Sequence, residues 1–149
     1  MLSLSGGGFM GLYTACVLAE LEAEIDRPIA RCFDLIAGTS IGGIIALGLA
    51  AEVQAGAIRN AIAVDGPRIF SRKPPPQSNL AKRLALLSNA RRAKYRAGKL
   101  RTTITSIIDE KKKIGHLQHR VMVPAVNLTK GSPQVFKTDH RPSSIETGR

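Results

Sequence analysis

A serine flanked by glycines, placed where one apolar run ends and another begins, most constrains the fold of this chain. Residues 33–37 form a short, mainly apolar run, and residues 44–51 are small and apolar, which predicts a strand, a tight turn and a helix in that order. The turn contains Gly38, Ser40 and Gly42. A side chain two positions before or after the serine would collide with the facing backbone, so a sharp turn needs glycine at both positions.

A turn of this kind is a nucleophile elbow. It holds the hydroxyl of Ser40 clear of the sheet, and the N-terminus of the following helix places backbone N–H groups and positive dipole density beside it. The alternative is a glycine-rich turn that only packs or that binds phosphate, because a Gly-x-Ser-x-Gly match often arises by chance.

Length and composition predict one globular domain. The chain has 149 residues, 44% of them hydrophobic, which is enough for a core and too apolar for a disordered protein. Its two cysteines, Cys16 and Cys32, have apolar neighbours and no framework spacing, so we expect no disulfides and a cytoplasmic location. No segment resembles a signal peptide, and the apolar run over residues 41–51 is shorter than the ~18 residues of a membrane span.

Positive charge is concentrated in the middle of the chain. The net charge is +11, and no acidic residue lies between Asp65 and Asp109. The segment over residues 68–101 is either a solvated helical face or a surface for anionic lipid headgroups, where each Lys or Arg adds about 1 kcal/mol. Nucleic-acid binding is a third interpretation. It is disfavoured because the segment has only two aromatic residues, Phe70 and Tyr95, on which bases could stack.

The remaining elements follow from periodicity and from turn residues. Helices are expected over residues 9–24, 53–63, 80–87 and 100–108. Strands are expected over residues 1–5, 120–128 and 134–137, of which the Val-rich 120–128 is predicted to be buried, with a turn at residues 130–133. The sequence Asp65-Gly66-Pro67 is expected to end a helix, and residues 71–79 to form a linker.

The first strand leads into Gly6, Gly7 and Gly8. Together with Gly11 this loop matches the Gly-x-Gly-x-x-Gly spacing of dinucleotide sites, but no acidic residue follows a second strand as that site requires. A better use of the loop is to donate backbone N–H groups where a carbonyl oxygen becomes negative during acyl transfer. Two such turns, at the carboxyl ends of two parallel strands, would converge on one point.

Taken together, the glycine loop within residues 2–11 and the elbow within residues 33–43 resemble the patatin-like phospholipase family. Residues 121–138 are similar to later core strands of its bacterial members, so the resemblance covers nearly the whole chain. It implies a three-layer α/β sandwich with a mostly parallel central sheet. It also implies a Ser-Asp dyad that cleaves fatty-acyl esters, as a phospholipase A does, with a lipid or phospholipid as substrate.

Carried over to this sequence, the resemblance makes Ser40 the nucleophile and assigns the oxyanion hole to Gly6, Gly7 and Gly8, with no metal and no cofactor. Met10 stands where the family usually has Arg or Lys. The family's general base lies in an Asp-Gly-Gly or Asp-Gly-Ala motif, which this sequence does not contain. We therefore expect a domain that is incomplete at its C-terminus, with residues 1–142 forming part of it and residues 143–149 a tail.

Other bases are less suitable. Asp65 lies too close to Ser40 along the chain, and Asp139 is followed by histidine instead of glycine. The histidines, His116, His119 and His140, are expected at the surface. A positioned base raises the reaction rate roughly 10²–10⁴-fold. Because no suitable base is found, the chain alone is expected to be weakly active or inactive.

The competing hypothesis is a non-catalytic basic module that binds anionic membrane or nucleic acid. We expect no nucleic-acid partner, and we expect peripheral membrane contact through residues 68–101; the oligomeric state stays open.

Overall fold

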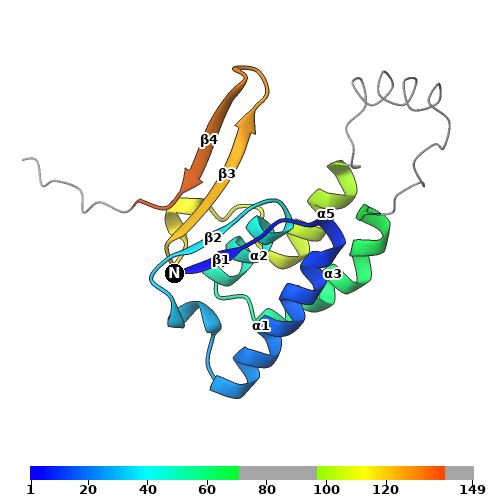
Figure 1. The fold of residues 1–149 in the computed structure, drawn as a ribbon, viewed down its shortest axis with the longest axis vertical. Coiled ribbons are helices and arrows are strands. Elements are labelled where there is room, and N and C mark those ends of the chain that lie inside the picture. The colour runs from blue at the N-terminus through cyan, green and yellow to red at the C-terminus, as the bar shows by residue number, and fades with distance from the viewer. Residues whose placement is uncertain (71–96, 140–149) are drawn as a thin grey trace, which may run out of the picture.

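The computed structural model describes residues 1–70 and 97–139. Its sheet has the order β1-β2-β3-β4, with β1 (Leu2–Leu4), β2 (Ile36–Gly38) and β3 (Val121–Asn127) parallel and β4 (Ser132–Lys137) antiparallel to β3 (Figure 1). The predicted α/β class and mostly parallel sheet are confirmed.

Helices account for most of the remaining described residues. They are α1 (Gly11–Ile25), α2 (Ile41–Ala50), α3 (Ala55–Phe70) and α5 (Ala97–Ile107), with short 3-10 turns at Gly8–Met10, Ile29–Cys32 and Ile114–His116. The predicted linker at 71–79, the helix at 80–87 and the domain boundary at 142 lie outside the described residues. No helix within residues 1–70 and 97–139 is long and apolar enough to cross a membrane.

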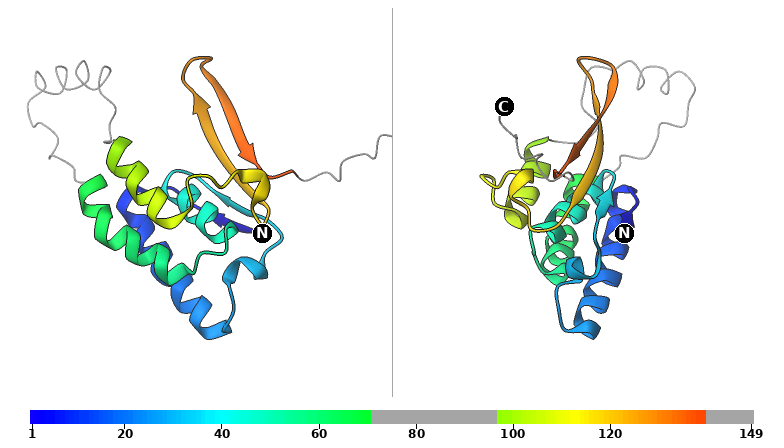
Figure 2. Two further views of the ribbon diagram at one scale, coloured as in Figure 1. Left: turned by 180° about the vertical axis from the view of Figure 1, so that it is seen from behind. Right: turned by 90° about the vertical axis from the view of Figure 1, so that its left-hand side faces the viewer.

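Helix α2 forms the centre of the core. It packs against β1, β2 and β3, while α1 pairs with α3 and α3 contacts α5 (Figure 2). The largest fully buried side chains come from these elements: Ile36, Ile45, Leu49, Ile58, Ile62 and Val121. Because α2 consists only of Gly, Ala, Leu and Ile, it can be enclosed without burying a polar side chain.

Helix α3 differs from the prediction. It continues through Asp65, Gly66 and Pro67 to Phe70, whereas we expected these residues to break it. Proline removes one helical hydrogen bond but does not prevent the helix from continuing when tertiary contacts hold it. Gly66 packs against the ring of Phe9, where an added Cβ would lie 2.5 Å from Cε2, and Thr103 of α5 donates a 2.8 Å hydrogen bond to Asp65 Oδ2. Packing therefore overrides the local signal.

Strand β3 is also less buried than its valine content predicted. Val121 is fully buried, but Val126 is 66% exposed. The reason is that β2 has three residues and pairs with only Val121 and Met122, so the rest of β3 pairs with β4 alone. The resulting hairpin extends away from the body of the molecule (Figure 1). The predicted partner strand is confirmed, and Ser132 and Pro133 belong to it instead of to the turn.

A charged cluster joins three segments beyond the C-terminal end of α2. Glu52, which has a φ of 60°, accepts hydrogen bonds from Arg31 Nε at 2.8 Å and Arg31 Nη2 at 3.2 Å. Its Oε1 also lies 3.1 Å from Nε2 of His119. The hydrogen bond from Arg31 and then that from His119 lower the pKa of Glu52 from 4.5 to about 2.

We expect this cluster to make stability depend on acid pH. A carboxyl whose pKa is lower in the folded chain stabilises the fold above its unfolded pKa, and this stability is lost as the pH falls through the folded pKa. Glu52→Gln should therefore lower the free energy of unfolding at pH 7, and its difference from wild type should shrink between about pH 5 and 2. Urea titrations across this range measure it. Glu24→Gln, at an exposed position of α1, is the control, and a difference independent of pH would contradict the prediction.

Candidate active site

Ser40 stands at the junction between β2 and α2, with its side chain exposed. Its backbone has φ 54° and ψ −124°, a conformation that costs a non-glycine residue about 1–3 kcal/mol. Although Ser40 occupies the N-cap position of α2, its hydroxyl makes no capping hydrogen bond. The hydroxyl is thus held at an exposed helix N-terminus without serving the helix.

The two glycines around Ser40 lie where backbone meets backbone. A Cβ at Gly38 would lie 2.2 Å from the carbonyl oxygen of Gly42, and one at Gly42 would lie 2.4 Å from the carbonyl oxygen of Leu4. Neither neighbour is a side chain that could rotate away. This close approach lets α2 begin directly against the ends of β1 and β2.

The glycine loop and the serine turn meet at the same edge of the sheet, because Leu4 and Gly38 are register partners in parallel strands. The N–H of Gly6 donates a 2.9 Å hydrogen bond to Thr39 Oγ1, and the N–H of Thr39 donates one of 3.2 Å to the carbonyl of Leu4. A Cβ at Gly6 would be 3.2 Å from Cβ of Ser40. The structure thus brings the two predicted motifs together.

The backbone donors near Ser40 are not equivalent. The N–H of Gly6 is already bonded to Thr39. In the described part of the chain, no carbonyl or side chain accepts a hydrogen bond from the N–H of Gly7, Gly8 or Ile41. These three N–H groups are therefore available to an acceptor, and that of Ile41 lies at the positive end of the α2 dipole.

Thr39 is a residue that the sequence did not point to. It lies one position before the serine, and a single hydroxyl residue in a turn is too common to be a signal. Gly11 was noted only for its spacing, yet a Cβ there would lie 2.6 Å from both Cγ atoms of Ile41, the residue after Ser40. Both contacts join residues that are about 30 positions apart in the sequence.

We predict that Thr39→Val loosens the glycine loop. Valine keeps the branched shape but removes the acceptor for Gly6, which should cost about 0.5–1.5 kcal/mol of stability. The rate at which Ser40 reacts with a fluorophosphonate should fall as well, since the donors of the loop would be less well positioned. Thr39→Ser keeps the hydroxyl and should behave as wild type in both measurements. Equal effects of the two variants would show that the hydrogen bond is not responsible.

The other candidate bases belong to other parts of the fold. Asp65 is inside α3, bonded to Thr103, and Asp139 is exposed. His119 contacts Glu52 beyond the far end of α2, about 15 Å from Ser40 along a ten-residue helix, and is more buried than predicted. His116 is exposed, as expected. Within residues 1–70 and 97–139, no group of three or more His, Cys, Asp or Glu residues is arranged to hold a metal ion.

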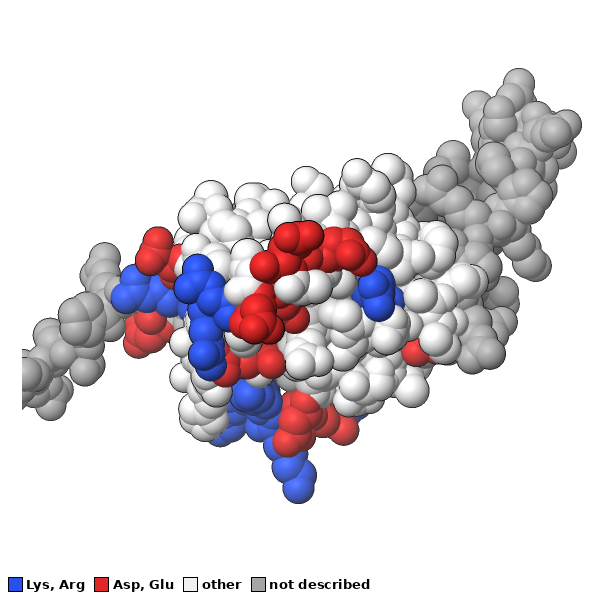
Figure 3. Space-filling view, turned by 90° about the horizontal axis from the view of Figure 1, so that it is seen from below, with Lys and Arg blue, Asp and Glu red and all other residues white. Residues whose placement is uncertain are grey.

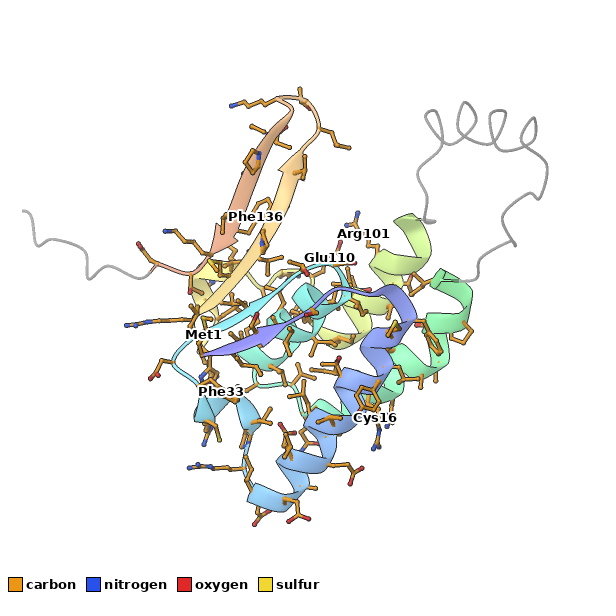
Figure 4. The ribbon with its side chains drawn as sticks, in the orientation of Figure 1. Met1, Cys16, Phe33, Arg101, Glu110 and Phe136 are labelled. Atoms are coloured by element: carbon orange, nitrogen blue, oxygen red, sulfur yellow. The ribbon has the colours of Figure 1, made fainter. Side chains whose placement is uncertain are left out.

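A separate cavity of about 260 Å³ lies beside α2 and α5. Its apolar lining residues are Leu47, Ile104, Ile108, Ile114 and Leu117. Arg101 and Glu110, which form an ion pair, also line it (Figure 4). None of its lining residues belongs to the glycine loop or to the serine turn, so it is distinct from the candidate site.

The fold and the site define an α/β protein whose glycine loop and serine turn share one sheet edge. The sequence profile of the family described as patatin-like phospholipase matches residues 2–145, so the chain belongs to this family.

Among its relatives, a protein named cGAMP-activated phospholipase from Pseudomonas aeruginosa is 48% identical over 96% of this chain and 40% of its own length. One of the same name from Vibrio cholerae is 39% identical over 100% of this chain and 44% of its own length. Patatin-like protein 1 of Oryza sativa is 34% identical over 93% of this chain and 35% of its own length. The chain thus spans less than half the length of these relatives.

Proposed function

We propose that this chain carries the nucleophile and the oxyanion hole of a lipid acyl hydrolase of the phospholipase A type. Ser40 is the nucleophile, and the Gly6–Gly8 loop forms the oxyanion hole, with the N–H groups of Gly7 and Gly8 as its donors and Gly6 fixing the loop to Thr39. The observation that carries this proposal is the strained, exposed Ser40 beside unbonded N–H groups at a helix N-terminus.

In the proposed reaction, Ser40 Oγ attacks the carbonyl carbon of a fatty-acyl ester. The carbonyl oxygen becomes negative and accepts hydrogen bonds from the loop, which contribute roughly 10²–10³-fold for each donor. The C–O bond of the ester then breaks, the leaving oxygen takes up the proton that Ser40 gave to the base and departs as a free alcohol, and water hydrolyses the acyl-serine to release the fatty acid. The resemblance implies that an aspartate accepts the serine proton in this family. Among the described residues, no carboxylate is hydrogen-bonded to Ser40: Asp65 is bonded to Thr103, and Glu52 to Arg31 and His119.

The test is covalent labelling. A fluorophosphonate should react with the folded chain at Ser40, identified by mass spectrometry of the labelled peptide, and urea-unfolded protein gives the background. Ser40→Ala should remove the label, whereas Ser3→Ala, on β1, should not change it. Equal labelling of folded and unfolded chains would overturn the proposal and favour a non-catalytic module.

The relatives named cGAMP-activated phospholipase suggest how the site is controlled. We propose that phospholipid hydrolysis at Ser40 is increased by cGAMP. Because the chain alone is expected to be weakly active or inactive, the rate at which Ser40 reacts with a fluorophosphonate, measured with and without cGAMP, tests this, and Ser40→Ala is the control. The membrane role proposed for residues 68–101 falls mainly on residues 71–96, outside the described residues, so no contact in the structure supports it.

A further inference from the structure

The glycine loop beside Ser40 is held in place at its two ends. At one end the N–H of Gly6 donates a hydrogen bond to Thr39 Oγ1, and at the other the loop runs into the 3-10 turn that begins at Gly8. Gly7 and Gly8, whose φ values are 156° and 60°, lie between these points. Three successive glycines leave the backbone unusually free, so the direction of their N–H groups depends on what fixes the residues that follow.

Ionic contacts do not provide this support. The first 19 residues contain no Asp, Glu, Lys or Arg, so no side chain of the loop or of the first half of α1 can form an ion pair. Charged side chains of both signs are instead mixed on the lower face of the molecule (Figure 3). The loop therefore depends on hydrogen bonds and on packing.

Packing is supplied by Phe9, the first residue after the three glycines. Its ring lies against Gly66 of α3, where an added Cβ would be 2.5 Å from Cε2 and 2.6 Å from Cδ2 of the ring. Glycine weakens the interior of a helix relative to alanine, and Pro67 beside it removes a further helical hydrogen bond. The helix thus keeps its two least helix-forming residues where the ring of Phe9 occupies the space of a side chain.

The part of α3 that receives the ring is itself fixed. Ile62, one turn earlier, and Ile69 are both buried. Asp65, next to Gly66, accepts a 2.8 Å hydrogen bond from Thr103, a buried residue of α5. Helix α3 also contacts α1 along its length (Figures 1 and 2). A ring packed on this turn therefore lies against a rigid support.

We propose that Phe9 is a positioning residue for the candidate oxyanion hole: α3 holds its ring at Gly66, and the ring holds the end of the glycine loop. Phe9 follows Gly8 directly, and only two side-chain torsions separate its ring from the backbone, so a displacement of the ring is passed to the loop. The loop is then fixed before Gly7 by Thr39 and after Gly8 by Phe9. This proposal deepens the proposed function and rests on it for its purpose, because the N–H groups of Gly7 and Gly8 are the donors named there.

The test is a double-mutant cycle on the full chain, with the rate of fluorophosphonate labelling at Ser40 as the readout. Gly66→Ala should lower this rate roughly tenfold or more, because its methyl group displaces the ring and each well-placed donor contributes roughly 10²–10³-fold. Phe9→Ala should lower the rate by a similar factor. In the Phe9→Ala background, Gly66→Ala should change the rate less than about twofold, because the ring that it displaces is absent.

Two controls in the same helix separate positioning from stability. Gly56→Ala adds the same methyl group where no atom lies within 4 Å and should leave the labelling rate unchanged. Ile58 is fully buried, so Ile58→Val should lower the free energy of unfolding and leave labelling of the folded chain unchanged. Urea unfolding followed by circular dichroism gives the stability of each variant. If Gly66→Ala does not fold, Phe9→Ala, which removes a 42% exposed side chain, still tests the proposal.

Backbone dynamics test the positioning without any chemistry. In the chain carrying Ser40→Ala, nuclear magnetic resonance relaxation should give amide order parameters for Gly7 and Gly8 near those of rigid backbone, about 0.85. Adding Gly66→Ala should lower them below about 0.6, the range of flexible backbone. Adding Gly56→Ala should leave them unchanged.

Three results would overturn the proposal. They are a labelling rate in folded Gly66→Ala within about twofold of wild type, an equal loss from Gly66→Ala when Phe9 is already alanine, and an equal loss in Ile58→Val. Order parameters that fall with Gly66→Ala, in a chain whose Ser40 is never labelled, would uphold the support of the loop by Phe9 and contradict only the proposed function.

Discussion

Gly38→Ala is expected to destabilise the fold by about 3 kcal/mol or more, a large part of the stability of a small domain. The added methyl carbon would lie 2.2 Å from the carbonyl oxygen and 2.4 Å from the carbonyl carbon of Gly42. Relief requires that the start of α2 move away from β2, which would also disturb the contact of Gly42 with Leu4. Urea unfolding followed by circular dichroism measures the loss.

Gly56→Ala is the matched control for this variant. Gly56 lies in α3, and no atom would be within 4 Å of an added Cβ, so alanine should stabilise the helix by up to about 1 kcal/mol. The two substitutions add the same methyl group and are expected to have opposite signs. If Gly38→Ala stayed within 1 kcal/mol of wild type, the close approach between β2 and α2 would not exist in solution.

The second large effect concerns Ser40 itself. Ser40→Gly should remove all fluorophosphonate labelling and at the same time make the chain more stable than Ser40→Ala, by about 1 kcal/mol. Glycine adopts φ 54°, ψ −124° without strain, which stabilises the folded chain by about 1–3 kcal/mol. The greater conformational freedom of glycine in the unfolded chain offsets about 0.5–1 kcal/mol of this gain. Loss of the hydroxyl costs no capping bond, since Ser40 makes none.

Alanine at position 40 keeps the strain and loses only the nucleophile. The pair Ser40→Gly and Ser40→Ala therefore separates backbone strain from chemistry, with labelling and urea unfolding as the two measurements. Backbone strain at an exposed serine whose side chain makes no stabilising hydrogen bond is typical of a functional site. If Ser40→Gly unfolded more easily than Ser40→Ala, the strain argument would be wrong, although the labelling result would still test the nucleophile.

Much of the candidate site could be predicted because its motifs are local. The apolar run, the glycines and the small-residue run lie within about twenty consecutive residues, and steric conflict between near neighbours leaves few conformations for them. Strand β1 and the start of α2 were expected close to where the structure has them. The convergence of the two loops followed from the parallel pairing of their strands.

The failures lie where a residue's state depends on partners distant in sequence. Helix α3 continues through Pro67 because Phe9 and Thr103 hold its last turns. Val126 is exposed because β2 is too short to pair beside it. His119 is partly buried because Glu52, 67 positions earlier, approaches it. A pattern of apolar residues indicates that a surface can be buried, but not whether anything covers it.

By itself, the sequence determined the strand, turn and helix around Ser40, the glycine loop and the resemblance to a family, since all of these depend on short-range sterics and spacing. Only the tertiary structure decided which N–H groups near Ser40 are unbonded, because the N–H of Gly6 donates its hydrogen bond to the hydroxyl of Thr39, 33 positions away in the sequence. It also decided which side of α1 is exposed. Both outcomes depend on long-range packing, which assigns each backbone donor and each apolar face to a partner or leaves it open.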